Sequence, residues 1–243
     1  MDPWDILAES RYSDLTSGRD VTFTNILFPT ILQILLNEKR GNEFSILDVG
    51  CHIGYLTGLL SEHATHITGI DPSANGIQRA KGHLKDKANV LLNRITLEEY
   101  TRQTKRKFDF VIAHMTLQVI EDLKGSITNI ASLLRPGGGF LFSIPHPCFW
   151  ALIKEEIGHE KFNYQKPSSH KNRFKVGDQE VEVPYYHRPL ARYSECLFTS
   201  GFVIERMFEP FPDDEDMKLY PRSWIYPGFL FTLCRLQSES EIK

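Results

Sequence analysis

Apolar positions follow two different periods along this chain. Between residues 23 and 35 they recur at steps of three and four, so the first forty residues are predicted to be helical, with Pro29 as a kink or division and Gly41 as a stop. From residue 45 onward, short apolar runs alternate with helical segments. The runs predict strands at 45–49, 67–70, 90–92, 108–112, 140–144, 202–206 and 228–236, and the segments between them predict helices at 55–60, 76–85, 123–134 and 190–200.

Strands that are almost continuously apolar and alternate with helices predict an α/β fold, in which a parallel sheet is covered on both faces. We expect one domain over residues 1–243, with the helical region of residues 1–40 as a lid. Residues 135–139, RPGGG, predict a helix exit and a tight turn. Residues 147–188 show no clear period, and because long loops in compact domains are usually functional, they predict a cap inserted after the fifth strand.

Composition and charge exclude several classes of protein. With 41% hydrophobic residues, 24% charged residues and a net charge of -3, the chain is typical of a globular protein whose field attracts neither nucleic acid nor anionic lipid. The basic run at residues 102–107 predicts a solvated loop. No apolar stretch approaches about 18 residues and the N-terminus lacks signal-peptide features, so we expect a cytoplasmic protein without a membrane span. The four cysteines have no metal-ligand spacing, and neither disulfides nor a metal site are expected.

The most informative local feature is a strand that runs into a glycine-bearing turn, Ile46-Leu47-Asp48-Val49-Gly50-Cys51-His52-Ile53-Gly54. In open α/β sheets ligands bind beyond the carboxyl ends of the strands, where glycines let the backbone approach the ligand. The turn therefore predicts a nucleotide-type pocket. The alternative is that its glycines serve packing alone.

An acidic residue, Asp71, ends the next predicted strand about twenty residues downstream. A carboxylate at that position can accept both hydroxyl protons of a ribose. The alternative is that Asp71 only caps the helix that follows. Because the glycine turn and the acid occur together at this separation, we favour the ribose interpretation.

Five segments occur in order along the chain: ILDVGCHIGYLT, GIDPSANGIQRAK, FDFVIAHMTLQVIED, LLRPGGGFLFSIPHPCF and GFVIERMFEP. They resemble the motifs of class I S-adenosylmethionine-dependent methyltransferases, in the branch that acts on small molecules. The resemblance implies a Rossmann-like sheet of seven mostly parallel strands with a reversed last strand, and S-adenosylmethionine as the cofactor. A Rossmann dehydrogenase is the rival interpretation, but the GxGxxG spacing is absent because His52 stands where the second glycine would be.

The resemblance also implies which residues bind the cofactor. Asp48 and the backbone of the turn after it are expected at the methionine end, Asp71 at the ribose, and the end of the fourth strand beside the amino acid part. The family commonly has glycine at the position of His52, so this side chain must point away from the cofactor. The residues assigned in this way are Tyr12, Arg19, Asp48, Gly50, Cys51, His52, Asp71, Ile95, Thr96, Ala113 and His114.

Methyl transfer from a sulfonium needs mainly a well-positioned acceptor, and a general base helps when the acceptor has a proton to lose. His146 between two prolines is the first candidate for that base, and His187 after the expected cap is the second. We expect methylation of O, N or C of a small, aromatic or apolar metabolite. The alternatives are a cyclase that uses the same fold, and a non-catalytic interaction subunit. The acceptor and the oligomeric state stay open.

Overall fold

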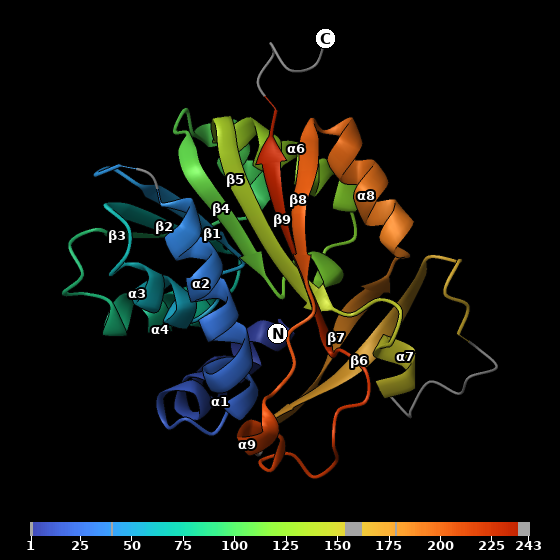
Figure 1. Ribbon diagram of the computed structural model, residues 1–243. Helices are drawn as coiled ribbons and strands as arrows, with labels where there is room; N and C mark the ends of the chain where they lie inside the picture. Colours follow the sequence, from blue (N-terminus) through green and yellow to red (C-terminus); the bar gives the residue numbers. More distant parts are fainter. Residues whose placement is uncertain (1, 40, 154–161, 178, 238–243) are drawn as a thin grey trace.

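The computed structural model describes residues 2–39, 41–153, 162–177 and 179–237, and its centre is a seven-stranded sheet (Figure 1). The strand order is β3-β2-β1-β4-β5-β9-β8. Neighbours from β3 to β5 pair in parallel, whereas β9 pairs antiparallel with both β5 and β8. The strands are β1 (Ser45–Val49), β2 (His66–Asp71), β3 (Val90–Arg94), β4 (Phe108–His114), β5 (Leu134–Pro145), β8 (Phe202–Phe208) and β9 (Phe229–Leu236). This is the predicted α/β fold with a reversed last strand.

Helices cover both faces of the sheet, as the strand pattern predicts (Figure 1). Alternate residues of β1 show the division, since Ile46 packs into one core with α1, α2 and α3, and Leu47 packs into the other with α6 and α8. The helices are α1 (Pro3–Thr16), α2 (Phe28–Glu38), α3 (Tyr55–Leu60), α4 (Ala74–His83), α5 (Leu97–Gln103), α6 (Leu123–Leu133), α7 (Trp150–Ile153), α8 (Leu190–Thr199) and α9 (Asp214–Met217). Within the described ranges, none of them reaches the length and apolarity that a bilayer span needs.

The predicted helical region at the N-terminus is divided into two parts. Helix α1 starts from Asp2, whose side chain accepts the N–H of Trp4 at 2.9 Å, and ends before Ser17. A π-helical turn, η1 (Phe23–Leu27), then runs into α2, which has Pro29 in its first turn. Because Leu27 and Phe28 also have helical backbone angles, η1 and α2 form one continuous helical run, and Pro29 directly follows the π-helical turn in it.

The segment expected as a cap contains an antiparallel hairpin, β6 (Ser168–Val176) and β7 (Gln179–His187), which sequence reasoning missed. Alternate residues of β7 are buried, beginning with Val181 and Val183. These two valines pack with Leu7 of α1. Figure 1 shows the hairpin and α1 at the end of the sheet where β4 and β5 finish. The hairpin thus lies where a ligand of an open α/β sheet would bind.

The prediction for the RPGGG segment is wrong in part. Strand β5 begins at Leu134, which pairs with Phe108, and the next pairs join Gly139 to Phe110. The glycine run is therefore a wide irregularity within the β4–β5 ladder, with Gly137 in the left-handed region at a φ of 72°. Glycine permits this backbone without the steric penalty of a side chain.

Candidate functional site

Two adjoining cavities, of about 400 and 330 Å³, lie at the carboxyl ends of β1, β2 and β4. The larger cavity is walled by the ends of β1 and β2, the start of α5, the first turn of α6 and the short helix η2 (Leu117–Val119). The smaller cavity is walled by α1, η1, the end of β4 and the β6–β7 hairpin. Both cavities are lined by Trp4, Gly50, His52, Met115 and Val119.

In the turn after β1, glycine is required at two positions, both by the backbone conformation and by neighbouring atoms of the protein. Gly50 has a φ of 77° and Gly54 a φ of 69°, in the left-handed region. A Cβ on Gly50 would lie 2.4 Å from Oγ1 of Thr116, and one on Gly54 would lie 2.8 Å from Cβ of Ala80. Both interpretations of this motif therefore apply, because Gly50 lines the cavities and also permits close packing.

His52 occupies the third left-handed position of the turn, with a φ of 46°. Its backbone N–H donates to Oδ2 of Asp71 at 2.9 Å, and its Nε2–H donates to the carbonyl of Trp4 at 2.8 Å. Its ring lies against Gly76 of α4, where a Cβ would come within 2.6 Å of Cδ2 of His52. The imidazole is thus directed towards α1 and α4, and it occupies space that a side chain at Gly76 would fill.

Asp71, at the end of β2, is a buried acid that lines the larger cavity. Oδ1 accepts the N–H of Ser73 at 2.8 Å, and Oδ2 accepts that of His52. Burial raises the pKa of Asp71 in spite of these two hydrogen bonds. The helix after it is capped by Ser73, which accepts the N–H of Gly76, so Asp71 is not the cap of α4.

Asp48 and Cys51 line the smaller cavity beneath the turn. The Asp48 carboxylate is fully buried and accepts the hydroxyl of Thr57 at 2.6 Å. Burial raises the pKa of Asp48 to about 7 and raises that of the Cys51 thiol well above its usual range. Asp48 is therefore close to its titration midpoint near neutral pH.

The predicted residues after β3 line the larger cavity at its outer wall. The N–H of Ile95 donates to the carbonyl of Asp71 at 3.0 Å, which joins the ends of β2 and β3. The hydroxyl of Thr96 caps α5 in a reciprocal arrangement with Glu99. An acidic side chain is also present on this wall, since Glu98 lines the cavity two residues beyond Thr96. Sequence reasoning stopped at residue 96 and missed it.

The end of β4 separates two predicted residues. Ala113 is buried in the core and lines neither cavity, whereas His114 lines the smaller one. Nδ1 of His114 contacts Oγ of Ser143 at 2.6 Å. Burial, with a further contribution from the charge of Arg11, lowers the pKa of His114 to about 3, so its imidazole is neutral.

Helix α1 contributes Arg11 in place of the predicted Tyr12 and Arg19. Tyr12 lies under the guanidinium of Arg79 at 3.8 Å, and Arg19 is 59% exposed and paired with Asp14. Neither lines a cavity. The side chains of α1 that do face the smaller cavity recur at helical spacing, and they are Trp4, Leu7, Arg11 and Leu15.

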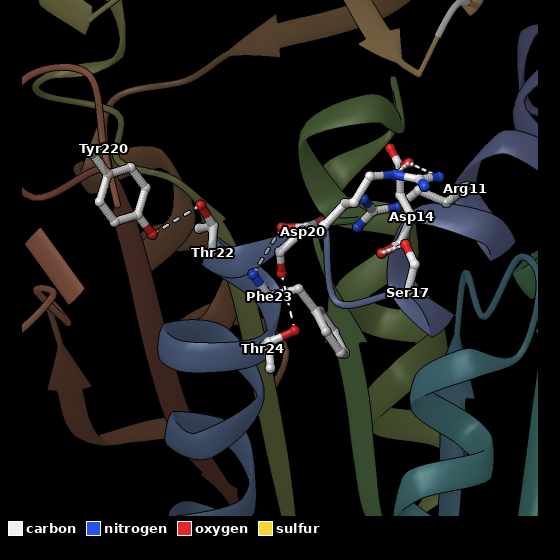
Figure 2. Close-up of polar contacts among 9 residues, drawn as sticks. Arg11, Asp14, Ser17, Asp20, Thr22, Phe23, Thr24 and Tyr220 are labelled. Carbon is white, nitrogen blue, oxygen red and sulfur yellow. Dashed lines mark hydrogen bonds and ion pairs between the residues drawn. The ribbon is translucent and has the colours of Figure 1, made fainter. Parts of the chain in front are cut away.

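Arg11 is held by Asp20 in the segment between α1 and η1. Nη1 of Arg11 lies 2.5 Å from Oδ2 of Asp20, and Oδ1 of Asp20 accepts the N–H of Phe23 at 2.9 Å. Figure 2 shows Asp20 amid these contacts, with the hydroxyl of Thr24 donating to its carbonyl. The carboxylate therefore fixes a guanidinium at the wall of the smaller cavity and caps the turn that supplies Phe23 to that wall.

The two predicted catalytic histidines lie outside the linings of both cavities. His146 is 2% exposed, its Nε2 lies 2.7 Å from Oε1 of Glu209, and its Nδ1 accepts the N–H of Cys148. His187 is fully buried, and its Nε2 binds the carbonyl of Tyr164 at 2.9 Å. The structure thus places both histidines in contacts within the protein and outside the two cavity linings, and their catalytic role stays a prediction.

Arg188, next to His187, joins the hairpin to the helix η2 that lines both cavities. Its guanidinium is buried and donates to three backbone carbonyls around η2, those of Leu117, Ile120 and Glu121. The distances are 3.2, 2.5 and 2.7 Å. This arginine therefore fixes the wall that η2 contributes.

Comparison with known proteins relates this arrangement to one family. The model of the family described as methyltransferase domain matches residues 23–176. Ubiquinone biosynthesis O-methyltransferases are 32% identical over 140 residues in Coxiella burnetii and 33% identical over 135 residues in Histophilus somni. The alignments cover 57% and 52% of this chain, and in both cases 57% of the relative, so the chain spans little more than half of these curated relatives.

Solved structures share the fold over most of their length. An S-adenosylmethionine-dependent methyltransferase from Clostridium acetobutylicum has a TM-score of 0.65 at 15% identity, covering 94% of this chain and 97% of that one. The N-methyltransferase NodS from Bradyrhizobium japonicum, in complex with S-adenosyl-L-homocysteine, has a TM-score of 0.58 at 17% identity, covering 87% and 86%. Because the family model matches more than half of the 243 residues of this chain, the chain belongs to the methyltransferase-domain family.

Proposed function

We propose that the protein transfers a methyl group from S-adenosylmethionine to a small, aromatic or apolar acceptor. The observation that carries the proposal is the pair of cavities that meet at Gly50, His52 and Met115, the larger lined by the buried acid Asp71 and the smaller by several aromatic rings. A cofactor that extends from the larger cavity past this junction would meet an acceptor in the smaller one. The motif resemblance and the family membership support the same assignment.

The residues of the larger cavity fit the cofactor. Asp71 has one N–H on each carboxylate oxygen, so lone pairs remain for two ribose hydroxyls. Apolar side chains of Ile70, Ile95 and Leu97 line the same cavity and suit an adenine ring. When bound, S-adenosylmethionine supplies a methyl group on a positively charged sulfur; the acceptor's lone pair takes the methyl carbon, the sulfur keeps the electron pair, and a proton on the acceptor atom leaves to solvent.

The methionine end would lie between the glycine turn and α1. Asp48 and Cys51 line the smaller cavity, Gly50 and His52 line both cavities, and Arg11 is a cation at the wall of the smaller one. We assign Arg11 to the cofactor carboxylate in place of Arg19. The exposed Arg19 is instead paired with Asp14 and lines neither cavity.

The smaller cavity fits a planar or apolar acceptor because rings supply much of its wall. Those rings come from elements far apart in the sequence, namely Phe23, Tyr55, Phe174, Tyr185 and Phe229. Helix α1 and the hairpin both line this cavity and pack on each other through Leu7 and Val183. Together they would cover the acceptor and exclude water, which is the role expected for the N-terminal lid and the inserted cap.

Calorimetry with S-adenosyl-L-homocysteine tests the cofactor assignment first. We expect saturable binding by the wild type, and the absence of heat at millimolar ligand would contradict the proposal. Incubation with S-adenosylmethionine labelled at the methyl group and a panel of aromatic hydroxy, amino and carbon acids then tests transfer. Label on the acceptor supports a transferase, whereas a rearranged acceptor without label would identify a cyclase instead.

A further inference from the structure

We propose that His114 recognises the acceptor as a neutral hydrogen-bond donor through Nε2–H, so that the site takes an oxygen nucleophile rather than an amine or carbon. The proposal rests on the proposed function, since it assigns the substrate class of the smaller cavity. His114 ends β4, lines that cavity, and is only partly exposed. Rings flank it on two sides, Phe23 at 5.9 Å and Phe231 at 6.4 Å between centroids, and they fix the plane of the imidazole.

The partner of Nδ1 decides which nitrogen carries the proton. Oγ of Ser143 is buried and lies 2.6 Å from Nδ1 of His114 and 3.2 Å from the backbone nitrogen of Met115. The Met115 N–H, which it shares with the Ser143 carbonyl at 2.9 Å, is a donor only, so Oγ accepts from it. The hydroxyl proton of Ser143 then requires an acceptor, and Nδ1 is the acceptor within reach among the described residues.

Protonation of Nδ1 would leave this buried hydroxyl with two incoming N–H groups and no acceptor for its own proton. Such an arrangement would leave a buried donor without an acceptor, which is rare in folded proteins. The imidazole is therefore the Nε2–H tautomer. Its low pKa, a result of burial, keeps it from taking a second proton near neutral pH.

Within the described part of the chain, Nε2 of His114 has no hydrogen-bond partner. It also differs from the buried polar atoms without a partner, because it is not fully enclosed. It therefore presents a single N–H to the smaller cavity. A second feature fixes this geometry, because Met115 holds a left-handed backbone at a φ of 52° through its N–H bond to the Ser143 carbonyl at 2.9 Å. The carboxyl end of β4 is thus held rigidly where an acceptor would approach.

A fixed N–H donor favours nucleophiles that have one lone pair for attack and another to accept its hydrogen bond. An oxygen nucleophile attacks with one lone pair and keeps another that can accept from Nε2–H. A neutral amine has one lone pair, so accepting from His114 would withdraw the electrons that must attack the methyl carbon. A carbon nucleophile offers no conventional acceptor at the reacting atom. The donor would also stabilise negative charge on a phenolic or enolic oxygen.

Nitrogen NMR of the protein labelled with 15N-histidine tests the tautomer directly, without catalysis. Two-bond correlations distinguish the protonated from the unprotonated ring nitrogen, and we expect Nε2–H for His114. In Ser143→Ala the hydroxyl that fixes the tautomer is gone, and a mixture of tautomers is expected. A wild-type signal from Nδ1–H would overturn the proposal.

Binding of two matched probes tests the role. With S-adenosyl-L-homocysteine present, catechol should shift the Nε2 resonance of His114, and 1,2-phenylenediamine should shift it at least tenfold less at equal concentration. Equal shifts, or no shift with catechol at millimolar concentration, would overturn the oxygen preference. The cofactor product alone gives an independent reading of the proposed function, because its binding does not involve the probes.

Three variants separate the acceptor contact from a cofactor contact or a structural role. His114→Leu keeps volume but removes the donor, and we expect at least tenfold weaker catechol binding with S-adenosyl-L-homocysteine affinity within twofold of wild type. His114→Gln restores an N–H donor and should recover part of the catechol binding. His66→Leu, at an exposed histidine, is the matched control and should change neither affinity. Loss of S-adenosyl-L-homocysteine binding in His114→Leu would instead make His114 a cofactor contact.

Discussion

The backbone N–H of His52 donates to the carboxylate of Asp71 at 2.9 Å, and this bond joins the turn after β1 to the end of β2. The residue that stands in place of a glycine is therefore held by the acid that we assign to the ribose. Asp71 is buried and His52 is half-buried, and desolvation disfavours the charged form of each: it lowers the pKa of His52 and raises that of Asp71. The two residues act as one support for the larger cavity.

Replacement of Asp71 by Asn tests the ribose assignment. The amide keeps one acceptor oxygen but loses the charge, so a charged hydrogen bond worth about 1.5 to 3 kcal/mol is removed and affinity for S-adenosyl-L-homocysteine should fall by roughly 10- to 150-fold. Calorimetry measures this directly. Asp86→Asn, at an exposed position in the same half of the chain, is the control. Unchanged affinity in Asp71→Asn would show that the carboxylate does not contact the ligand.

The contact between His52 and Gly76 predicts a coupled pair of substitutions. Gly76→Ala adds a methyl group 2.6 Å from the His52 ring, so it should lower the free energy of unfolding even though alanine favours a helix. In the His52→Gly background the ring is gone, and the same substitution should cost less. We expect a coupling energy of about 1 kcal/mol from urea unfolding of the four proteins. Additive effects would contradict the contact.

The sheet and most helices could be predicted because each has a strong local period. The hairpin was missed for a physical reason, since β6 has polar residues at most positions and only β7 alternates clearly, through Val181, Val183 and Tyr185. Helix α5 was missed because seven residues, Leu97–Gln103, are too few for a helical period to stand out. Tertiary contacts with α6 stabilise it instead.

The positions of Asp48 and Asp71 at the cavities could be predicted because one motif places each of them near the end of a strand. Arg11 lines the smaller cavity and the predicted Tyr12 does not, because neighbouring helix residues point about 100° apart. The positions of the two histidines could not be predicted, because partners distant in the sequence fix their side chains. His146 is held by Glu209, 63 residues away, and no local sequence pattern indicates that contact.

A structural role for His146 predicts a loss of stability without a loss of chemistry. His146→Ala removes a buried ring that packs against Phe149 at 4.7 Å between centroids, along with its bond to Glu209, and should lower the free energy of unfolding by about 1 to 3 kcal/mol. Turnover per folded molecule should stay within twofold in a labelled-methyl assay. Glu209→Gln, which keeps an acceptor oxygen, should be milder. A large fall in turnover at full folding would restore His146 as a base.

The buried acid Asp48 predicts how stability depends on pH. Its pKa is 3.8 in the unfolded chain and about 7 in the fold, so between these values the folded state binds the proton more tightly. Stability from this group is therefore fully present below about pH 4, falls as pH rises to about 7, and is constant above it. Since one pKa unit corresponds to about 1.4 kcal/mol, ionisation of Asp48 costs about 4 kcal/mol at neutral pH and above.

Asp48→Asn removes that cost and keeps an oxygen that can accept the hydroxyl of Thr57. We expect the variant to be more stable than the wild type above pH 7 by up to about 4 kcal/mol, and the gap to close as the pH falls towards 4. Urea unfolding at four pH values measures it, with the exposed Asp86→Asn as a control that should follow the wild-type curve. Because Asp48 also lines the smaller cavity at the turn, the same substitution should weaken S-adenosyl-L-homocysteine binding. Parallel stability curves for wild type and Asp48→Asn would mean that Asp48 is already ionised in the fold, and a gain in stability with unchanged affinity would remove it from the cofactor site.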